Sequence, residues 1–214
     1  MHGRDETGSN RSVLIHADCA RQADRGRRTR PVRSVLPATL LGNTDRSAAV
    51  RLSMTLAGIP ITTIDGQSTS LEAYKDKVLL IVNVASRCGL APQYEKLEAL
   101  QKQYGDKGFT VLGFPSNQFL QELSSEDAIK DYCSTTWGVT FPMFEKVKVN
   151  GRSQHPLYAE LVKTPDADGH AGKVKWNFEK FVITPAGEVH RFRPPTEPDD
   201  PKIVELIEAS LPAR

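Results

Sequence analysis

One cysteine, Cys88, has the sequence surroundings of a reactive thiol. It follows an apolar run and precedes a helical pattern in the stretch VLLIVNVASRCGLAPQYEKLEAL, residues 78–100. We expect the run to be a buried strand and the pattern to be a helix that begins at the cysteine. Helix N-terminal amide groups and the guanidinium of Arg87 would then stabilise a thiolate, the nucleophilic form of cysteine. The alternative is an inert small residue in a tight turn.

The spacing of apolar residues predicts the elements that would position Cys88. Residues 77–85 form a β-branched run typical of a central strand covered on both faces, residues 94–104 are apolar at helical spacing, and residues 109–114 form a second buried run. This strand–helix–strand order predicts two parallel strands joined by a right-handed crossover. Reactive groups in open α/β sheets lie at the carboxyl ends of strands, where Cys88 falls.

The remaining elements define the fold class. The sequence predicts a strand at 59–64 before an Asp65-Gly66 turn, a helix beginning near 124–125, a strand at 141–149, a helix at 155–162, a hairpin of 176–183 and 188–192, and a helix at 203–211. We therefore expect an α/β fold in which a mixed β-sheet carries helices on both faces.

Four motifs resemble those of one protein family, in the same order. They are NVASRCGLAPQYEKLE (83–98), GFPSNQF (113–119), TTWGVTFPMF (135–144) and KWNFEKF (175–181). This series is similar to the motifs of the glutathione peroxidase family, a branch of the thioredoxin fold, and the resemblance covers about residues 57–212. It implies a thioredoxin-like fold and an antioxidant peroxidase that responds to oxidative stress and requires no metal or cofactor.

The resemblance assigns roles to three residues. Cys88 is the peroxidatic residue, whose thiolate attacks the O–O bond of hydrogen peroxide or an organic hydroperoxide and becomes a sulfenic acid. Trp176 and Asn177 match the Trp-Asn pair of the family's site, and their N–H groups can donate hydrogen bonds to a thiolate or to the leaving oxygen. Taken alone, Trp176 would also fit a core aromatic residue.

The family's catalytic glutamine is matched less closely. It normally lies three residues after the Phe of NQF and precedes Glu-Pro-Gly, whereas residues 119–124 read FLQELS, so one residue is missing and Pro-Gly is absent. We assign the role to Gln121 because it precedes Glu122, with Gln118 as the alternative; either could instead be a polar loop residue. Ser116 stands where the family frequently has a cysteine, so no thiol is available there.

Cys133, in IKDYCSTTW, resembles the resolving cysteine of thioredoxin-dependent members of the family. The resemblance implies a Cys88–Cys133 disulfide that thioredoxin reopens, with glutathione as the less favoured reductant. The alternative is a packed core residue, since Ile129 and Trp137 lie one helical turn away on either side. The short stretch 164–173 leaves little room for the assembly loop of tetrameric members, so a monomer is expected.

Composition excludes several other classes of protein. No apolar stretch is long enough for a membrane helix, and three cysteines are too few for a secreted disulfide framework, which favours the cytoplasm. The five histidines form no zinc motif, and no glycine-rich nucleotide loop is present. The sequence after Cys88 lacks the second cysteine of a disulfide oxidoreductase. A peroxide sensor that oxidises a partner protein would have the same sequence features and stays the alternative function.

Residues 1–53 differ from the rest of the chain. They contain many arginines and no lysine, and they show no sustained periodicity. We expect a disordered or non-native extension, with residues 54–214 forming the folded domain and Met54 a candidate true start. A targeting or nucleic-acid-binding role is disfavoured, because no apolar core follows the charges and no aromatic residues are interleaved with them.

Overall fold

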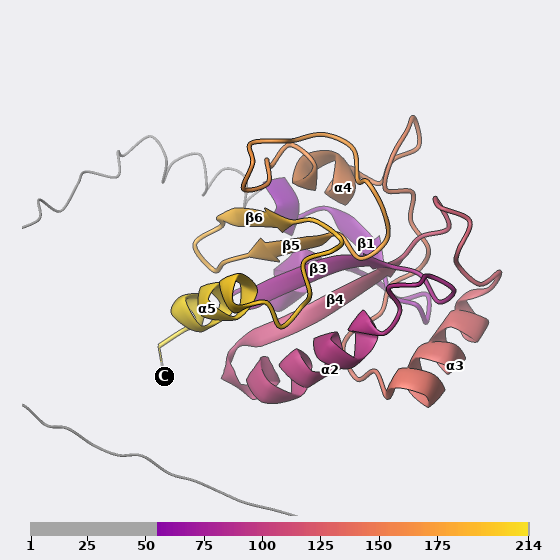
Figure 1. Cartoon of the computed structure of the whole chain (residues 1–214), viewed down its shortest axis with the longest axis horizontal. Helices are drawn as coiled ribbons and strands as arrows, with labels where there is room; N and C mark the ends of the chain where they lie inside the picture. Colours follow the sequence, from indigo (N-terminus) through magenta and orange to yellow (C-terminus); the bar gives the residue numbers. More distant parts are fainter. Residues whose placement is uncertain (1–54, 214) are drawn as a thin grey trace, which may run out of the picture. The chain divides into compact units, whose positions relative to one another are not determined.

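The structure is a computed structural model that describes residues 55–213 (Figure 1). The expectations for residues 1–53 lie outside this part of the chain. Its main sheet has the strand order β4-β3-β5-β6. The central strand β3 (Val78–Val84) pairs parallel with β4 (Phe109–Pro115) and antiparallel with β5 (Lys180–Ile183), and β5 pairs antiparallel with β6 (Val189–Phe192). The mixed sheet is therefore as predicted.

Both faces of this sheet are buried. Alternate residues of β3 contribute to two separate apolar clusters, with Leu80 and Val82 in one and Leu79 and Ile81 in the other. The first cluster includes buried residues of α2 (Gln93–Tyr104), α3 (Glu126–Trp137) and α5 (Pro201–Ser210), and the second includes those of α4 (Pro156–Leu161). Figure 1 shows α2 and α5 on one side of the strands and α4 on the other. The expected helix layers on both faces are thus present.

The smaller elements lie around this core. Strand β1 (Pro60–Thr62) pairs antiparallel with β2 (Ser68–Ser70), a strand that the sequence pattern did not indicate, across the expected turn, where Gly66 has a φ of +80°. Two short 3-10 helices, η1 (Leu71–Tyr74) and η2 (Gly105–Lys107), precede β3 and β4. No helix within residues 55–213 is long and apolar enough to cross a membrane.

The prediction of a strand at 141–149 is wrong. With the other described residues this segment makes two isolated bridges, Thr63 with Phe144 and Gly113 with Met143. Its main-chain bonds are divided between two neighbours: Gly113 donates to the Pro142 carbonyl, whereas Ile64 donates to the Met143 carbonyl. Because Pro142 has no N–H to continue a ladder, the segment fills the gap between β4 and β1 without joining either as a strand.

Candidate active site

Cys88 lies in a turn after β3, not at the first residue of a helix. Helix α2 begins at Gln93, with Pro92 as its N-cap, so the expectation that Cys88 opens the helix is wrong. Two tight turns lie between Cys88 and this helix. In one the Ala91 N–H donates to the Cys88 carbonyl, and in the other the Gln93 N–H donates to the Leu90 carbonyl. Pro92 was the available signal, since proline is common where helices start.

The turn itself supplies a donor to the sulfur. The Leu90 N–H lies 3.4 Å from the Cys88 Sγ and donates to it, while the side chain of Cys88 is almost completely buried. An amide N–H aimed at sulfur stabilises negative charge there, which is the role expected of the helix N-terminus. The local turn therefore places one backbone N–H donor on the Cys88 sulfur.

Gln121 and Asn177 lie together, next to the turn that carries Cys88. The Asn177 Nδ2 donates to the Gln121 Oε1 at 2.9 Å, and the main-chain N–H of Arg87 donates to the Gln121 carbonyl at 2.9 Å. Gln118 instead accepts from the Asn150 N–H at an exposed position, 3.3 Å away. The geometry thus connects Gln121, and not Gln118, with two of the predicted site segments.

The Asn177 bond also sets the orientation of the Gln121 amide. Its oxygen is occupied by Asn177, and among the described residues its nitrogen donates to no protein atom. The NH₂ group of Gln121 is therefore left as a hydrogen-bond donor at the site. The Asn177 Oδ1 is buried and has no protein partner in the same part of the chain.

Trp176 is 42% exposed, which excludes a buried core role for its indole. Its ring lies against Phe119, with the ring centroids 4.9 Å apart, and its carbonyl accepts a hydrogen bond from the Asn83 Nδ2 at 3.1 Å. Asn83 belongs to β3, the strand that leads to Cys88. Trp176 is thus fixed through its backbone to the strand that carries the cysteine, while much of its indole faces solvent.

Glu122 has a structural role that the sequence did not reveal. Its Oε1 accepts from the N–H of Ser86 at 3.0 Å and from the N–H of Leu123 at 2.7 Å. Burial raises the pKa of the Glu122 carboxyl, and the hydrogen bonds from Ser86 oppose that shift. Glu122 therefore joins the Gln121 loop to the Cys88 turn. In the sequence it had served only to identify Gln121.

Cys133 has different surroundings. It is 1% exposed, on the apolar face of α3, and it belongs to the same cluster as Ile129. Burial raises the pKa of its thiol to about 11, although the nearby Tyr94 hydroxyl lowers it, and the negative charge of Glu122 raises it further. Cys88 and Cys133 are both free thiols in this structure. A resolving role for Cys133 stays a prediction.

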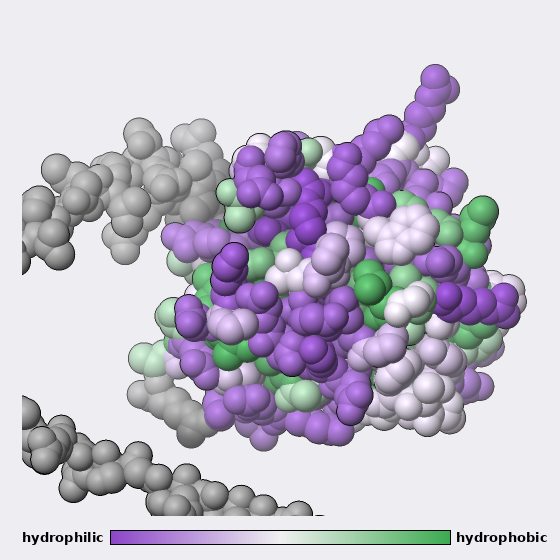
Figure 2. Space-filling view, in the orientation of Figure 1, coloured by the Kyte–Doolittle hydropathy of each residue, from purple (hydrophilic) through white to green (hydrophobic). Residues whose placement is uncertain are grey.

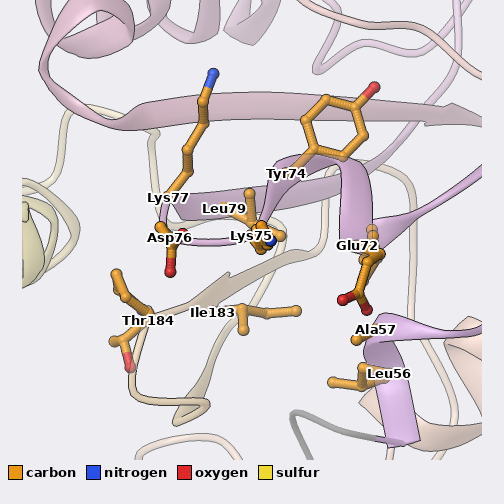
Figure 3. Close-up of a pocket in the computed structure, with 12 residues that line it drawn as sticks. Leu56, Ala57, Glu72, Tyr74, Lys75, Asp76, Lys77, Leu79, Ile183 and Thr184 are labelled. Atoms are coloured by element: carbon orange, nitrogen blue, oxygen red, sulfur yellow. The ribbon is translucent and has the colours of Figure 1, made fainter.

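Two of the cavities formed by the described residues border the sheet at different ends. A cavity of about 620 Å³ lies beside the site and is lined by Leu90 and Trp176 together with residues of two loops. Figure 2 shows apolar and weakly polar residues gathered on the right of this face, over the loops that follow β3 and β4. The other, of about 380 Å³, lies near the start of β3, where Leu79 and Ile183 line it (Figure 3). The first is lined by Trp176, a third cavity of about 290 Å³ is lined by Cys133, and a fourth of about 450 Å³ is lined by Gln118.

One group of potential metal ligands occurs among residues 55–213: Asp166, Asp168 and His170. The Asp166 Oδ1 already accepts from the N–H groups of Asp168 and His170, and its Oδ2 pairs with Arg193. These contacts hold the pKa of the Asp166 carboxyl down to about 2, with the His170 N–H the largest cause and Arg193 the next. A carboxylate that already has these donors is poorly placed to bind a cation.

Comparison with known proteins gives consistent matches. The sequence pattern of the family described as glutathione peroxidase matches residues 58–162. The chain is 49% identical over 169 residues to the thioredoxin/glutathione peroxidase BtuE of Escherichia coli (strain K12), covering 69% of this chain and 92% of that protein.

Two solved structures agree with the fold. The crystal structure of Trgpx in apo form is 39% identical, with a TM-score of 0.56, and covers 74% of this chain and 99% of that one. A thiol:disulfide interchange protein of the thioredoxin family, from Chlorobium tepidum TLS, has the same TM-score of 0.56 at 19% identity and covers 74% of this chain and 96% of its own. The second likeness concerns the fold alone and establishes the thioredoxin-like architecture.

Proposed function

The chain belongs to the glutathione peroxidase family and is a peroxidase, and on that premise we propose that it reduces hydrogen peroxide and organic hydroperoxides through Cys88. The observation that carries this proposal is the junction of three segments: the Cys88 turn, the Gln121 loop and Asn177, joined by the Arg87–Gln121 and Asn177–Gln121 hydrogen bonds. It brings amide donors to the end of the strand that bears a cysteine with an N–H directed at its sulfur.

The proposed first step is a displacement at oxygen. The Cys88 thiolate attacks one oxygen of the peroxide, the S–O bond forms, the O–O bond breaks, and the departing oxygen takes a proton to become water or an alcohol. Donors placed at the departing oxygen lower the barrier most, because negative charge develops there. The Gln121 NH₂ and the Trp176 indole N–H are our candidates for these donors.

The proposed second step restores the thiol through Cys133. Its sulfur attacks the sulfur of the Cys88 sulfenic acid, a disulfide forms, and the hydroxyl leaves as water with the proton from Cys133. Thioredoxin then supplies two electrons to reopen the disulfide. The name of the Escherichia coli relative includes both thioredoxin and glutathione, and the presence of a second cysteine favours thioredoxin here.

A buried thiol with a pKa near 11 is a poor nucleophile at neutral pH. We therefore propose that α3 opens locally before the second step. This opening has to break the caps at the ends of α3. The N-cap Ser125 accepts from the Ala128 N–H at 3.3 Å, and after the left-handed Gly138 the Val139 N–H donates to the carbonyl of Cys133 itself at 3.2 Å. Loss of the C-terminal cap would free the turn that carries Cys133. We expect the enzyme to act as a cytoplasmic monomer.

A kinetic experiment tests the proposal and separates it from a sensor that oxidises a partner. Reduced protein is mixed with hydrogen peroxide or cumene hydroperoxide in a stopped-flow instrument, and steady-state turnover is then measured with thioredoxin and thioredoxin reductase, or with glutathione. We expect rapid oxidation followed by sustained turnover with thioredoxin. Rapid oxidation without turnover by either reductant would favour the sensor, and absence of oxidation would contradict both functions.

A further inference from the structure

Asn83 is a completely buried polar residue next to the end of β3, a strand whose other residues are apolar and buried. A buried carboxamide is costly unless its groups are hydrogen-bonded. Its Nδ2 donates to the Trp176 carbonyl at 3.1 Å, and its Oδ1 accepts from the Glu179 N–H at 3.1 Å. Its main-chain carbonyl accepts from the Phe178 N–H at 2.6 Å. All three bonds therefore go to the segment that contains Trp176 and Asn177.

Lys180 holds the same segment from its other end. Its side chain is completely buried at the first residue of β5, next to β3 (Figure 1). The Nζ donates to the Phe178 carbonyl at 2.6 Å and to the Pro194 carbonyl at 3.3 Å. Pro194 lines the cavity beside Trp176. A buried lysine whose donors are directed to two carbonyls stabilises a defined backbone path there.

The backbone of Phe178, which is bonded to both Asn83 and Lys180, is strained. Phe178 has a φ of +64°, in the left-handed region that non-glycine residues rarely occupy. Such a conformation persists where the surroundings hold it, and it clusters at functional sites. Here both backbone polar groups of Phe178 are bonded, the N–H to Asn83 and the carbonyl to Lys180. The strained residue directly follows Asn177, whose amide orients Gln121.

We propose that Asn83 and Lys180 are positioning residues that hold the Trp176–Asn177 backbone, so that Asn177 reaches Gln121 and Trp176 lines the cavity that it shares with Leu90 of the Cys88 turn. This inference rests on the proposed function, because it assumes that Trp176 and Asn177 assist peroxide reduction at Cys88. Neither positioning residue touches the peroxide. Each acts through the carbonyl or N–H groups of residues 176–179.

The proposal predicts a selective loss. Peroxide oxidation of Cys88 depends on correctly placed donors, and small misplacements of such groups have large effects on rate. Reduction of the oxidised protein by dithiothreitol does not use those donors. A purely structural role would instead affect folding and both half-reactions together.

The chain offers a matched control for Asn83→Asp. The Asn150 Nδ2 donates to the Val174 carbonyl at 2.9 Å and its Oδ1 accepts from the Val174 N–H at 2.9 Å. The Asn150 carboxamide thus makes the same kinds of hydrogen bond as that of Asn83, but to Val174, which precedes residues 176–179. Asn150→Asp removes an equivalent donor at a position outside the proposed site. Lys180→Met is the second test variant, because it keeps an unbranched side chain and removes the donors.

The experiment measures the second-order rate constant for oxidation by hydrogen peroxide, the rate of reduction by dithiothreitol, and the fluorescence anisotropy of Trp176. The chain has two tryptophans, so all variants carry Trp137→Phe and Trp176 is then the one tryptophan that fluoresces. We expect Asn83→Asp and Lys180→Met to slow oxidation by about tenfold or more, to lower the anisotropy, and to leave the reduction rate nearly unchanged. Asn150→Asp should retain the parent values.

Each outcome decides a different claim. Equal losses in Asn83→Asp and Asn150→Asp, or an unchanged oxidation rate and anisotropy in folded Lys180→Met, would overturn the positioning role. If Asn83→Asp does not fold, Lys180→Met alone decides. If the parent protein does not react with peroxide, the proposed function fails, whereas the anisotropy still tests whether the two residues hold Trp176.

Discussion

The two cysteines lie in the same apolar cluster, yet their immediate surroundings differ in kind. Cys88 is in a turn whose backbone is hydrogen-bonded to the Gln121 loop and whose Leu90 N–H is directed at the sulfur. Cys133 is on a regular helix, where burial raises its pKa to about 11. The first environment directs an N–H donor at the sulfur, and the second surrounds the thiol with apolar side chains, which disfavour its ionised form. The two cysteines are both buried, so burial does not separate them; the N–H group directed at the Cys88 sulfur does.

Replacing the first cysteine should have the largest effect. Cys88→Ser should abolish peroxide reduction, because a serine hydroxyl without a nearby base is a poor nucleophile toward peroxide. The assay is turnover with hydrogen peroxide and thioredoxin. Cys19, the third cysteine of the chain, lies in residues 1–53, which we expect to be dispensable, so Cys19→Ser provides the control and should keep its activity. Appreciable turnover in Cys88→Ser would remove the contrast between the two cysteines.

Replacing the second cysteine should block only the second half of the cycle. Cys133→Ser should still react once with peroxide, accumulate the Cys88 sulfenic acid and lose turnover with thioredoxin, since no disulfide can form. Trapping with dimedone followed by mass spectrometry measures the sulfenic acid. In the unsubstituted protein one equivalent of peroxide should yield a Cys88–Cys133 disulfide. Normal thioredoxin turnover by the variant would leave Cys133 as a core residue only.

Gln121 and Gln118 provide a matched pair of substitutions that tests which glutamine assists the reaction at Cys88. Gln121→Leu should slow oxidation by about 100-fold, the effect typical of removing one donor from a charge-stabilising site. Gln118→Leu should have little effect, because within residues 55–213 the Gln118 side chain is hydrogen-bonded to the exposed Asn150 N–H and to no predicted site residue. Stopped-flow oxidation by hydrogen peroxide is the measurement. The opposite order of effects would transfer the role to Gln118.

The smallest predicted effect concerns Lys180, the buried residue that binds the segment containing Trp176 and Asn177. Burial lowers the pKa of Lys180 to about 7, and the negative charges of Glu197 and Glu179 oppose this shift. Because this folded-state value lies below the 10.5 of an exposed lysine, the unfolded chain binds more protons between those two pH values, so stability rises with pH there.

Urea unfolding of the parent and of Lys180→Met tests this linkage. Between pH 7 and 9 the parent should gain stability relative to Lys180→Met, with a slope of at most about 1.4 kcal/mol per pH unit. The comparison subtracts the titration of all other groups. Parallel stability profiles for the two proteins would show that Lys180 is not titrating in this range.

The sequence predicted the core of the fold because its signals are local and strong. The apolar run of β3, interrupted by Asn83 alone, and the helical spacing of apolar residues in α2 identify elements whose burial is set by composition. The hairpin of β5 and β6 was predicted for the same reason, although β5 begins at Lys180 and not at Trp176. The left-handed Phe178 interrupts that strand, and no local pattern reveals a φ imposed by distant hydrogen bonds.

The site was only partly predictable. The motif that contains Cys88 was evident, but the extended turn before α2 depends on Pro92 and on bonds to the Gln121 loop, which is distant in sequence. The contact between Gln121 and Asn177 likewise joins segments that meet only in the folded chain. Asn83 within an apolar run was a visible anomaly, and an unexpected polar residue in a buried strand deserves a search for its partners.

The most direct test of the account is to identify the atom that peroxide oxidises. Reduced protein receives one equivalent of hydrogen peroxide in the presence of dimedone, and peptides are then sequenced by mass spectrometry. The account predicts that the Cys133→Ser variant carries the adduct on Cys88. An adduct on Cys133 in the Cys88→Ser variant, formed as fast as the one on Cys88, would contradict it.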